Sequence, residues 1–129
     1  MDLPESMGKT WILRIVNFYS SLWLSTYGRL PIITNYGKLG KLLKPYKDNY
    51  SEYQLALMLM QYFEWYGLSG GDDFEHQRLH TKAFPLELFK FYADPIAVFL
   101  SDVIDDEKQV EQLVNRKLQE LSSEAQKSR

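Results

Sequence analysis

Residues 53–66, YQLALMLMQYFEWY, form the clearest helical segment of the chain. Apolar side chains extend almost all the way round this helix, and such a helix is normally buried at the centre of a domain. Ser51 and Glu52 precede it, and Gly67 follows it where a helix is expected to stop. The apolar positions include Leu55, Ala56, Met58, Leu59, Tyr62, Phe63 and Tyr66. We therefore predict a central helix from Tyr53 to Tyr66.

Residues 10–27 predict an amphipathic helix on the N-terminal side of this centre. Gly28 stands where glycine commonly ends helices, and Pro31 follows soon after. One face repeats with the spacing i, i+3, i+4, i+7 and carries Ile12, Ile15, Val16, Tyr19, Leu22 and Trp23. We expect this face to be buried in the core.

A shorter helix is predicted over residues 36–43 or 36–46. Gly37 and Gly40 weaken it, because glycine costs roughly 1 kcal/mol relative to alanine in a helix interior. Pro45 disfavours helical backbone at the residue before it. Either the helix is short, or its glycines admit a close neighbour.

Acidic residues and prolines mark further helix starts in the second half of the chain. The acids at 72–73 favour a helix N-terminus there. A proline stands at or near the first position of two short helices, predicted over 86–91 and 96–101. A last helix starts near the acids at 105–106.

These segments define the expected fold. No run alternates with period two between turn signals, so no β-sheet is predicted. We predict an all-α protein, a single compact irregular bundle of five to seven helices from which the C-terminal helix can extend. The domain is expected to span residues 1–122, and the polar residues 123–129 to form a frayed tail.

Composition narrows the class of protein. The chain has 129 residues, of which 45% are hydrophobic and 15% aromatic, enough to form one folded core. It has no cysteine, which excludes disulfides and thiolate metal sites and suits a reducing compartment. Residues 1–9 carry two acids and a proline where a secretory signal has bases, so we expect a cytoplasmic protein. Polar residues interrupt 11–27, so we expect no membrane span, although its aromatics leave a membrane-surface role open.

The charge is divided unevenly along the chain. Residues 1–47 carry seven bases and two acids, a net charge of +5, whereas residues 48–129 carry eight bases and fifteen acids, a net charge of −7. No acid occurs between Glu5 and Asp48. Such asymmetry is typical of a chain with one half facing a polyanion and the other facing solvent or a partner.

The first candidate site is the lysine-rich segment 36–47. Its lysines recur every third residue, and lysines held in a row neutralise phosphates and release counterions from nucleic acid. Tyrosines in and after the segment could stack or bond to phosphates, and Gly37 and Gly40 would let the backbone approach one. The alternative is an ordinary solvated helix face. The candidate contact residues are Arg29, Tyr36, Lys38, Lys41, Lys44 and Lys47, with Tyr46 and Tyr50 beside them.

Three weaker candidates lie in the second half. His76 and His80 share a helix face at the spacing i, i+4, but no third ligand is evident, so we assign no metal. Trp65 falls off the main apolar stripe and could anchor a protein partner, although aromatics at helical spacing usually belong to the core, which we favour. The C-terminal helix carries an apolar seam that includes Val110, Leu113 and Leu118. That seam either docks on its own domain or binds a partner or a second copy.

Three short motifs resemble small helical domains of bacteriophage and mobile-element replication proteins. They are YGRLP at 27–31, YGKLGKLL at 36–43 and YFEW at 62–65, within the stretch 18–100. In such proteins a similar step precedes a basic helix and a buried helix that ends in aromatic residues. The resemblance implies a role in DNA transactions or phage regulation, and it carries over no catalytic residue.

The expected function is binding and not catalysis, since the sequence contains no nucleophile-elbow serine, nucleotide loop or paired catalytic acids. We expect a nucleic-acid-binding, replication-associated accessory protein, phage or mobile-element encoded, acting in the host cytoplasm without a cofactor. DNA is the favoured partner. The alternative is a protein-interaction module or inhibitor that docks a partner through its acidic second half. A homodimer through the C-terminal helix is a further expectation.

Overall fold

The protein was described from a computed structural model, in which residues 3–28, 30, 36–64 and 89–127 are placed. All regular secondary structure in those ranges is helical, so the all-α prediction is confirmed for them. The elements are a short 3-10 helix η1 (Glu5–Met7) and the helices α1 (Trp11–Tyr27), α2 (Tyr36–Lys47), α3 (Glu52–Tyr62), α5 (Phe89–Phe99) and α6 (Glu107–Lys127).

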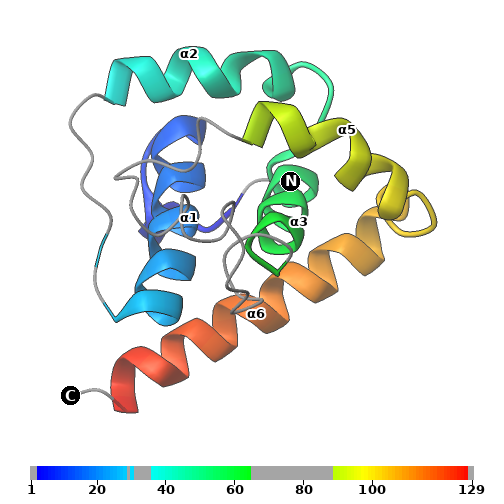
Figure 1. Cartoon of the computed structure of the whole chain (residues 1–129). Coiled ribbons are helices and arrows are strands. Elements are labelled where there is room, and N and C mark those ends of the chain that lie inside the picture. The colour runs from blue at the N-terminus through cyan, green and yellow to red at the C-terminus, as the bar shows by residue number, and fades with distance from the viewer. Residues whose placement is uncertain (1–2, 29, 31–35, 65–88, 128–129) are drawn as a thin grey trace, which may run out of the picture.

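Helix α3 occupies the centre of the fold, as its sequence predicts. It packs against α1, α5 and α6, which surround it in Figure 1. Its N-terminus is closed by a capping box, in which the Ser51 hydroxyl accepts from Gln54 N and the Gln54 side chain accepts from Ser51 N. Five consecutive residues, Leu55 to Leu59, are buried. Phe63 and Glu64 continue as a short π-helical turn, and the predicted end at Gly67 lies outside the described residues.

Helix α1 begins and ends where its sequence predicts. The Thr10 hydroxyl accepts a hydrogen bond from Leu13 N at 3.3 Å and caps the N-terminus. Gly28 adopts a left-handed conformation with φ of 73°, and its N–H donates to Leu24 O at 2.8 Å. The predicted apolar face is buried except for Ile12, which is half-buried.

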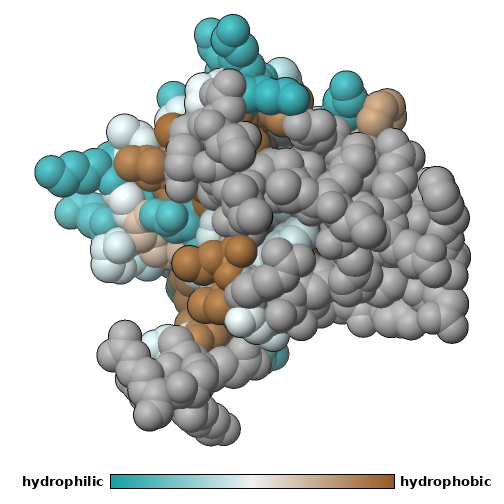
Figure 2. Space-filling view, turned by 60° about the vertical axis from the view of Figure 1, so that its left-hand side comes forward, coloured by the Kyte–Doolittle hydropathy of each residue, from teal (hydrophilic) through white to brown (hydrophobic). Residues whose placement is uncertain are grey.

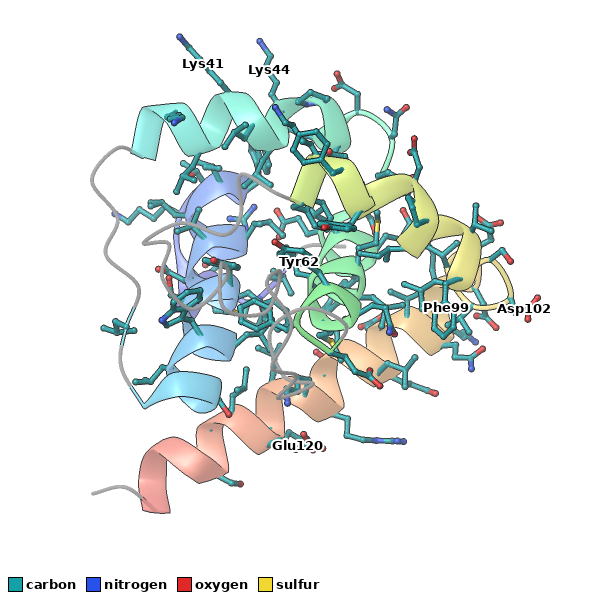
Figure 3. All side chains as sticks on the ribbon, in the orientation of Figure 1. Lys41, Lys44, Tyr62, Phe99, Asp102 and Glu120 are labelled. Atoms are coloured by element: carbon teal, nitrogen blue, oxygen red, sulfur yellow. The ribbon has the colours of Figure 1, made fainter. Side chains whose placement is uncertain are left out.

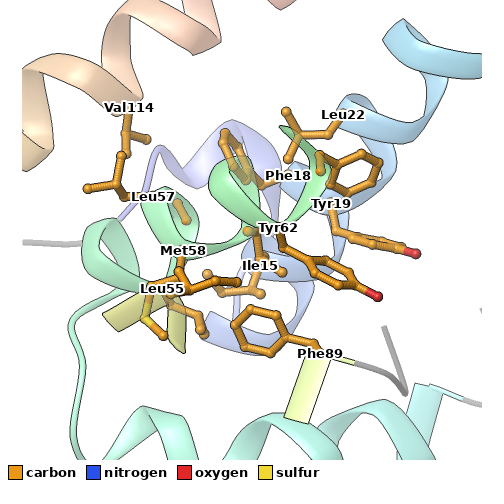
Figure 4. Packing of buried hydrophobic residues seen from close by; sticks show 14 of the residues in the cluster. Ile15, Phe18, Tyr19, Leu22, Leu55, Leu57, Met58, Tyr62, Phe89 and Val114 are labelled. Atoms are coloured by element: carbon orange, nitrogen blue, oxygen red, sulfur yellow. The ribbon is translucent and has the colours of Figure 1, made fainter. Parts of the chain in front are cut away.

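The core forms where α1, α3, α5 and α6 meet (Figure 4). Aromatic rings hold α3 to its neighbours: Phe63 lies 5.3 Å from Tyr19 of α1, and Tyr62 lies 5.5 Å from Phe89 of α5, measured between ring centroids. Val114 reaches the same core from α6, where it is fully buried. Burial of these large side chains is the main stabilising term of the fold.

A buried ion pair ties the N-terminal segment to this core. The Arg14 guanidinium of α1 holds the Glu52 carboxylate of α3 in a fork, with distances of 2.5 Å from Nη2 and 2.9 Å from Nε. Glu52 also accepts from Leu3 N at 2.7 Å, and Arg14 donates to Gly8 O at 3.3 Å. One pair therefore fixes η1, α1 and α3 relative to one another.

Helix α2 lies across one end of the molecule and is longer than predicted. It continues through Pro45 to Lys47. Proline removes only the hydrogen bond that residue 45 would donate to Lys41 O, and Pro45 is exposed, so its ring meets solvent. The last turn is held by its neighbours, because Tyr46 packs edge-on against Phe89 with ring centroids 5.3 Å apart. The shorter prediction, 36–43, is therefore wrong, whereas the longer one, 36–46, ends one residue before the observed end.

Helix α5 also runs through a proline. The predicted break at Asp94-Pro95 does not occur, and residues 89–99 form one helix. Pro95 is exposed, while Ala93 and Ile96 on the opposite side are buried against the core. Burial of the inner face outweighs the loss of one solvent-side hydrogen bond.

Helix α6 starts at the predicted acids and extends further than expected. The Asp106 carboxylate accepts from Gln109 N at 3.2 Å, as a helix cap does. The helix reaches Lys127, so the backbone of the predicted frayed tail is helical as far as that residue. The helix predicted from residues 72–73 lies outside the described ranges.

Candidate nucleic-acid interface

Helix α2 has a narrow apolar inner face and a basic outer face. Leu39 and Leu43 are buried at 2% and 1% exposure, and they fix the helix on the core. Three lysines consequently turn outward and are exposed: Lys38, Lys41 and Lys44. Figure 3 shows Lys41 and Lys44 projecting away from the body of the protein. In the space-filling view, hydrophilic side chains project from the same end, over α2 (Figure 2).

The spacing of the lysines makes the basic surface wind around the helix. Residues three apart differ by 300° on an α-helix, so each lysine is turned back by about 60° from the one before. Lys38, Lys41 and Lys44 therefore share the outer side. Lys47 is turned towards α1, where its ammonium lies 5.0 Å from the centre of the Trp11 ring. The predicted set of four divides into an outer face of three lysines and a fourth lysine at its edge.

Helix α2 itself carries no acid. No ion pair of Lys41 or Lys44 occurs among the described residues. Lys44 and Lys47 also stand in the last turn, where cations interact favourably with the helix dipole. This second role is structural and would hold those two lysines in place without any ligand.

The two glycines of α2 differ in position. Gly37 is exposed beside the lysine face, whereas Gly40 is turned towards α1. A Cβ added at Gly40 would lie 4.0 Å from Ile12 Cγ1, an ordinary contact distance. Gly40 therefore faces the protein and not a phosphate, and the packing does not require a glycine there.

Among the tyrosines near α2, Tyr46 faces the protein. Tyr46 is half-buried against Phe89, and burial raises the pKa of its hydroxyl, with Asp94 and Tyr50 adding to the effect. Tyr46 therefore belongs to the contact between α2 and α5. Arg29 lies outside the described residues, as does the side chain of Tyr36.

A cleft of about 420 Å³ opens at the Lys47 end of α2. Lys9 and Lys47 stand on its rim, Trp11 and Tyr50 are half-buried in its wall, and the Arg14–Glu52 ion pair lies against its floor. Glu52 is the only acid among the described residues that line the cleft, and Arg14 neutralises it. Local sequence patterns do not indicate this cleft, because only the fold brings residues 9–11 next to 47–50.

The residues predicted to bind a protein partner lie mostly in or against the core. Val110 is fully buried, and Leu113 and Leu118 are half-buried beside the core, so the seam of α6 docks on its own domain in this structure. Trp65 lies outside the described residues.

The outer face of α5 is apolar, which the sequence reading missed. Phe91, Val98 and Phe99 are 64%, 74% and 60% exposed. Together with Pro95 they follow the spacing i, i+4, i+7, i+8 of one helix side. This signal becomes visible only when α5 is read as continuous through its proline.

Within the described ranges, no three or more side chains are grouped so that they could hold a metal ion, and His76 and His80 lie outside those ranges. None of the helices there combines the length and apolarity needed to cross a bilayer.

No protein-family model, curated protein or solved structure matches this chain. The chemistry of its surfaces therefore carries any functional assignment.

Proposed function

We propose that the protein is a non-catalytic nucleic-acid-binding accessory protein that contacts phosphates through Lys38, Lys41 and Lys44. The observation that carries the proposal is an exposed face of three lysines on one helix, without an acid on that helix. Buried Leu39 and Leu43 hold this face outward, so the cations are positioned before any ligand arrives.

The chemistry of the face suits a polyanion such as a row of phosphates. Lysine is a compact point charge that neutralises phosphate without regard to base sequence, so binding of this kind is electrostatic and depends on salt. The resemblance of three motifs to phage and mobile-element replication proteins supports DNA as the polyanion.

A salt titration of DNA binding tests the proposal. We expect log Kd against log salt to have a slope of roughly 3 for duplex DNA if three phosphates are neutralised. The variant Lys38→Glu/Lys41→Glu/Lys44→Glu should bind at least about tenfold more weakly at low salt and lose about one unit of slope per lysine.

A matched charge control separates the face from the net charge. Lys90→Glu/Lys108→Glu/Arg116→Glu changes the charge by the same amount on the exposed surfaces of α5 and α6. This control should keep most of the affinity. Absence of binding at low salt, or equal losses in both triple variants, would show that α2 is an ordinary solvated helix.

A specific observation favours a second candidate function, docking of a protein partner through the acidic half. Three exposed acids lie on or just after α5, whose apolar outer face they border: Asp94, Asp102 and Asp105. One cation also lies on this face, since the Lys90 ammonium is 5.0 Å from the centre of the Phe91 ring. Phe99 and Asp102 lie close together at this edge of the molecule in Figure 3. An apolar face rimmed by acids fits an amphipathic segment with basic flanks.

The double variant Phe91→Ser/Phe99→Ser tests this second candidate. It removes two exposed rings and should leave the fold intact, while capture of a basic-flanked amphipathic peptide should be lost. If the double variant captures the peptide with the same efficiency as the wild type, the outer face of α5 is not the docking site. Dimerisation that disappears in the same variant would instead assign the face to a second copy.

A further inference from the structure

The cleft beside α2 joins cations and aromatic rings in one place. Lys9 and Lys47 stand on its rim, and Trp11 and Tyr50 are half-buried in its wall. A volume of about 420 Å³ exceeds what a single phosphate group fills. It falls within the range of roughly 300–1,000 Å³ that is typical of small-ligand sites.

The electrostatics of the cleft favour an anionic ligand. Its lining contains Lys9, Arg14 and Lys47 against one carboxylate, that of Glu52. Both oxygens of that carboxylate accept from Arg14, and one also accepts from Leu3 N. The two lysines are thus the charges left to meet a ligand, and neither has an ion-pair partner among the described residues.

The cleft also continues the lysine face. Lys47 follows Lys44 by one step of the same three-residue spacing, and the turn of the helix brings it from the outer side to the cleft. Its ammonium lies 5.0 Å from the centre of the Trp11 ring. A strand whose phosphates follow the outer lysines would therefore reach the cleft at its next contact.

We infer that the cleft holds one unpaired nucleotide of a single strand, or of a strand end, that runs along the lysine face of α2. This inference rests on the proposed function. Lys9 and Lys47 meet the phosphate, and the base packs on Trp11 or Tyr50. Bases in a duplex are stacked on one another and cannot enter, so the site distinguishes single-stranded from duplex nucleic acid.

The first measurement compares a single-stranded oligonucleotide with a duplex at the same salt concentration. Trp11→Leu should weaken binding of the single strand about tenfold, the loss of roughly one stacked base, and change duplex binding by less than about twofold. Tyr50→Leu provides a second variant in the same cleft, should Trp11→Leu fail to fold. Circular dichroism of each variant identifies loss of folding.

The conservative variant Trp11→Phe separates stacking from packing. Phenylalanine keeps an aromatic face, so it should retain most of the single-strand affinity that Trp11→Leu loses. In a Trp65→Phe background, Trp11 and Trp23 are the two remaining indoles, and Trp23 is only 1% exposed. Quenching of fluorescence by a single strand in that background should therefore disappear when Trp11→Phe is added.

The outcomes distinguish the inference from the proposed function. If folded Trp11→Leu and Tyr50→Leu bind both nucleic acids as the wild type does, or lose affinity for both equally, the inference is overturned. The lysine face would remain supported as long as Lys38→Glu/Lys41→Glu/Lys44→Glu still weakens binding. If the wild type binds neither nucleic acid at low salt, both proposals fall together.

Discussion

Helices α2 and α5 lie next to each other, meeting at Tyr46 and Phe89, and they carry opposite chemistry on their outer faces. Each has a narrow buried face and a proline on its solvent side. The outer face of α2 is a row of cations, whereas that of α5 is apolar with acids around it. Both inner faces are buried in the same core, so the two helices differ in the faces that they present to solvent.

The first and largest prediction sharpens this contrast between inner and outer faces. Leu43→Ala in α2 and Ile96→Ala in α5 should each lower the free energy of unfolding by about 2–4 kcal/mol, because both side chains are buried in a packed core. Lys41→Ala and Val98→Ala, on the exposed faces of the same helices, should change it by less than about 0.5 kcal/mol. Urea unfolding of the four variants measures both effects.

An outer-face variant that costs as much as an inner-face one would contradict this division. In that event the exposed residue would have a packing role within the domain. The corresponding outer face could then not be assigned to a partner.

The second prediction concerns the glycines, which α2 contains and α5 lacks. Gly40→Ala should raise the free energy of unfolding by about 0.5–1 kcal/mol, because a Cβ there meets only an ordinary contact at 4.0 Å. Gly28→Ala is the matched control, because a Cβ at Gly28 would meet open space but the backbone φ of 73° there is unfavourable for alanine. It should lower the free energy by about 1 kcal/mol. Thermal unfolding distinguishes the opposite signs.

Two changes of the same sign would contradict the glycine prediction. A loss of stability in Gly40→Ala would mean that α1 and α2 approach more closely than the structure shows. Gly40 would then be needed for packing after all.

The third and smallest effect lies where the two helices meet. The pKa of Tyr46 is raised by burial, and by Asp94 of α5 and Tyr50, so the folded state keeps its hydroxyl neutral to higher pH than the unfolded chain does. The stability that this group contributes is present below the ordinary tyrosine pKa of about 10 and is lost as the pH rises through the higher folded value. Tyr46→Phe should make the alkaline loss of stability shallower.

Unfolding in urea across that alkaline range measures the slope. Tyr53→Phe is the comparison, because burial also raises the pKa of Tyr53, which contacts Asn115 of α6 and lies outside the α2–α5 contact. If Tyr46→Phe leaves the slope of the free energy of unfolding against pH unchanged, the hydroxyl of Tyr46 is solvated. Tyr46 then packs less closely against Phe89 than the structure shows.

Local signals predicted much of the fold. Thr10 and Gly28 mark the ends of α1 because capping depends on residues adjacent to the helix. The nearly all-apolar segment starting at Ser51 predicted the central helix, since a helix without a polar face has to be covered on all sides. Both inferences rest on interactions within a few residues.

Tertiary packing decided the features that the sequence reading missed. Pro45 and Pro95 are strong local breakers, yet burial of Leu43 and Ile96 on the opposite sides keeps both helices continuous. The lysine face was found from spacing alone. The contact of Lys47 with Trp11, and with it the cleft, joins distant parts of the chain and has no local signature.

The proline in α2 has a consequence for the motions of the helix. Because Pro45 has no N–H to donate to Lys41 O, the last turn of α2 lacks one of its own backbone hydrogen bonds. It is held instead by the contact of Tyr46 with Phe89 of α5 and of Lys47 with Trp11 of α1. Such a turn can open and close as a small unit while the rest of the helix stays formed. We therefore expect this turn, at the edge of the cleft, to open more readily than the rest of α2, and occupation of the cleft should slow amide exchange there first.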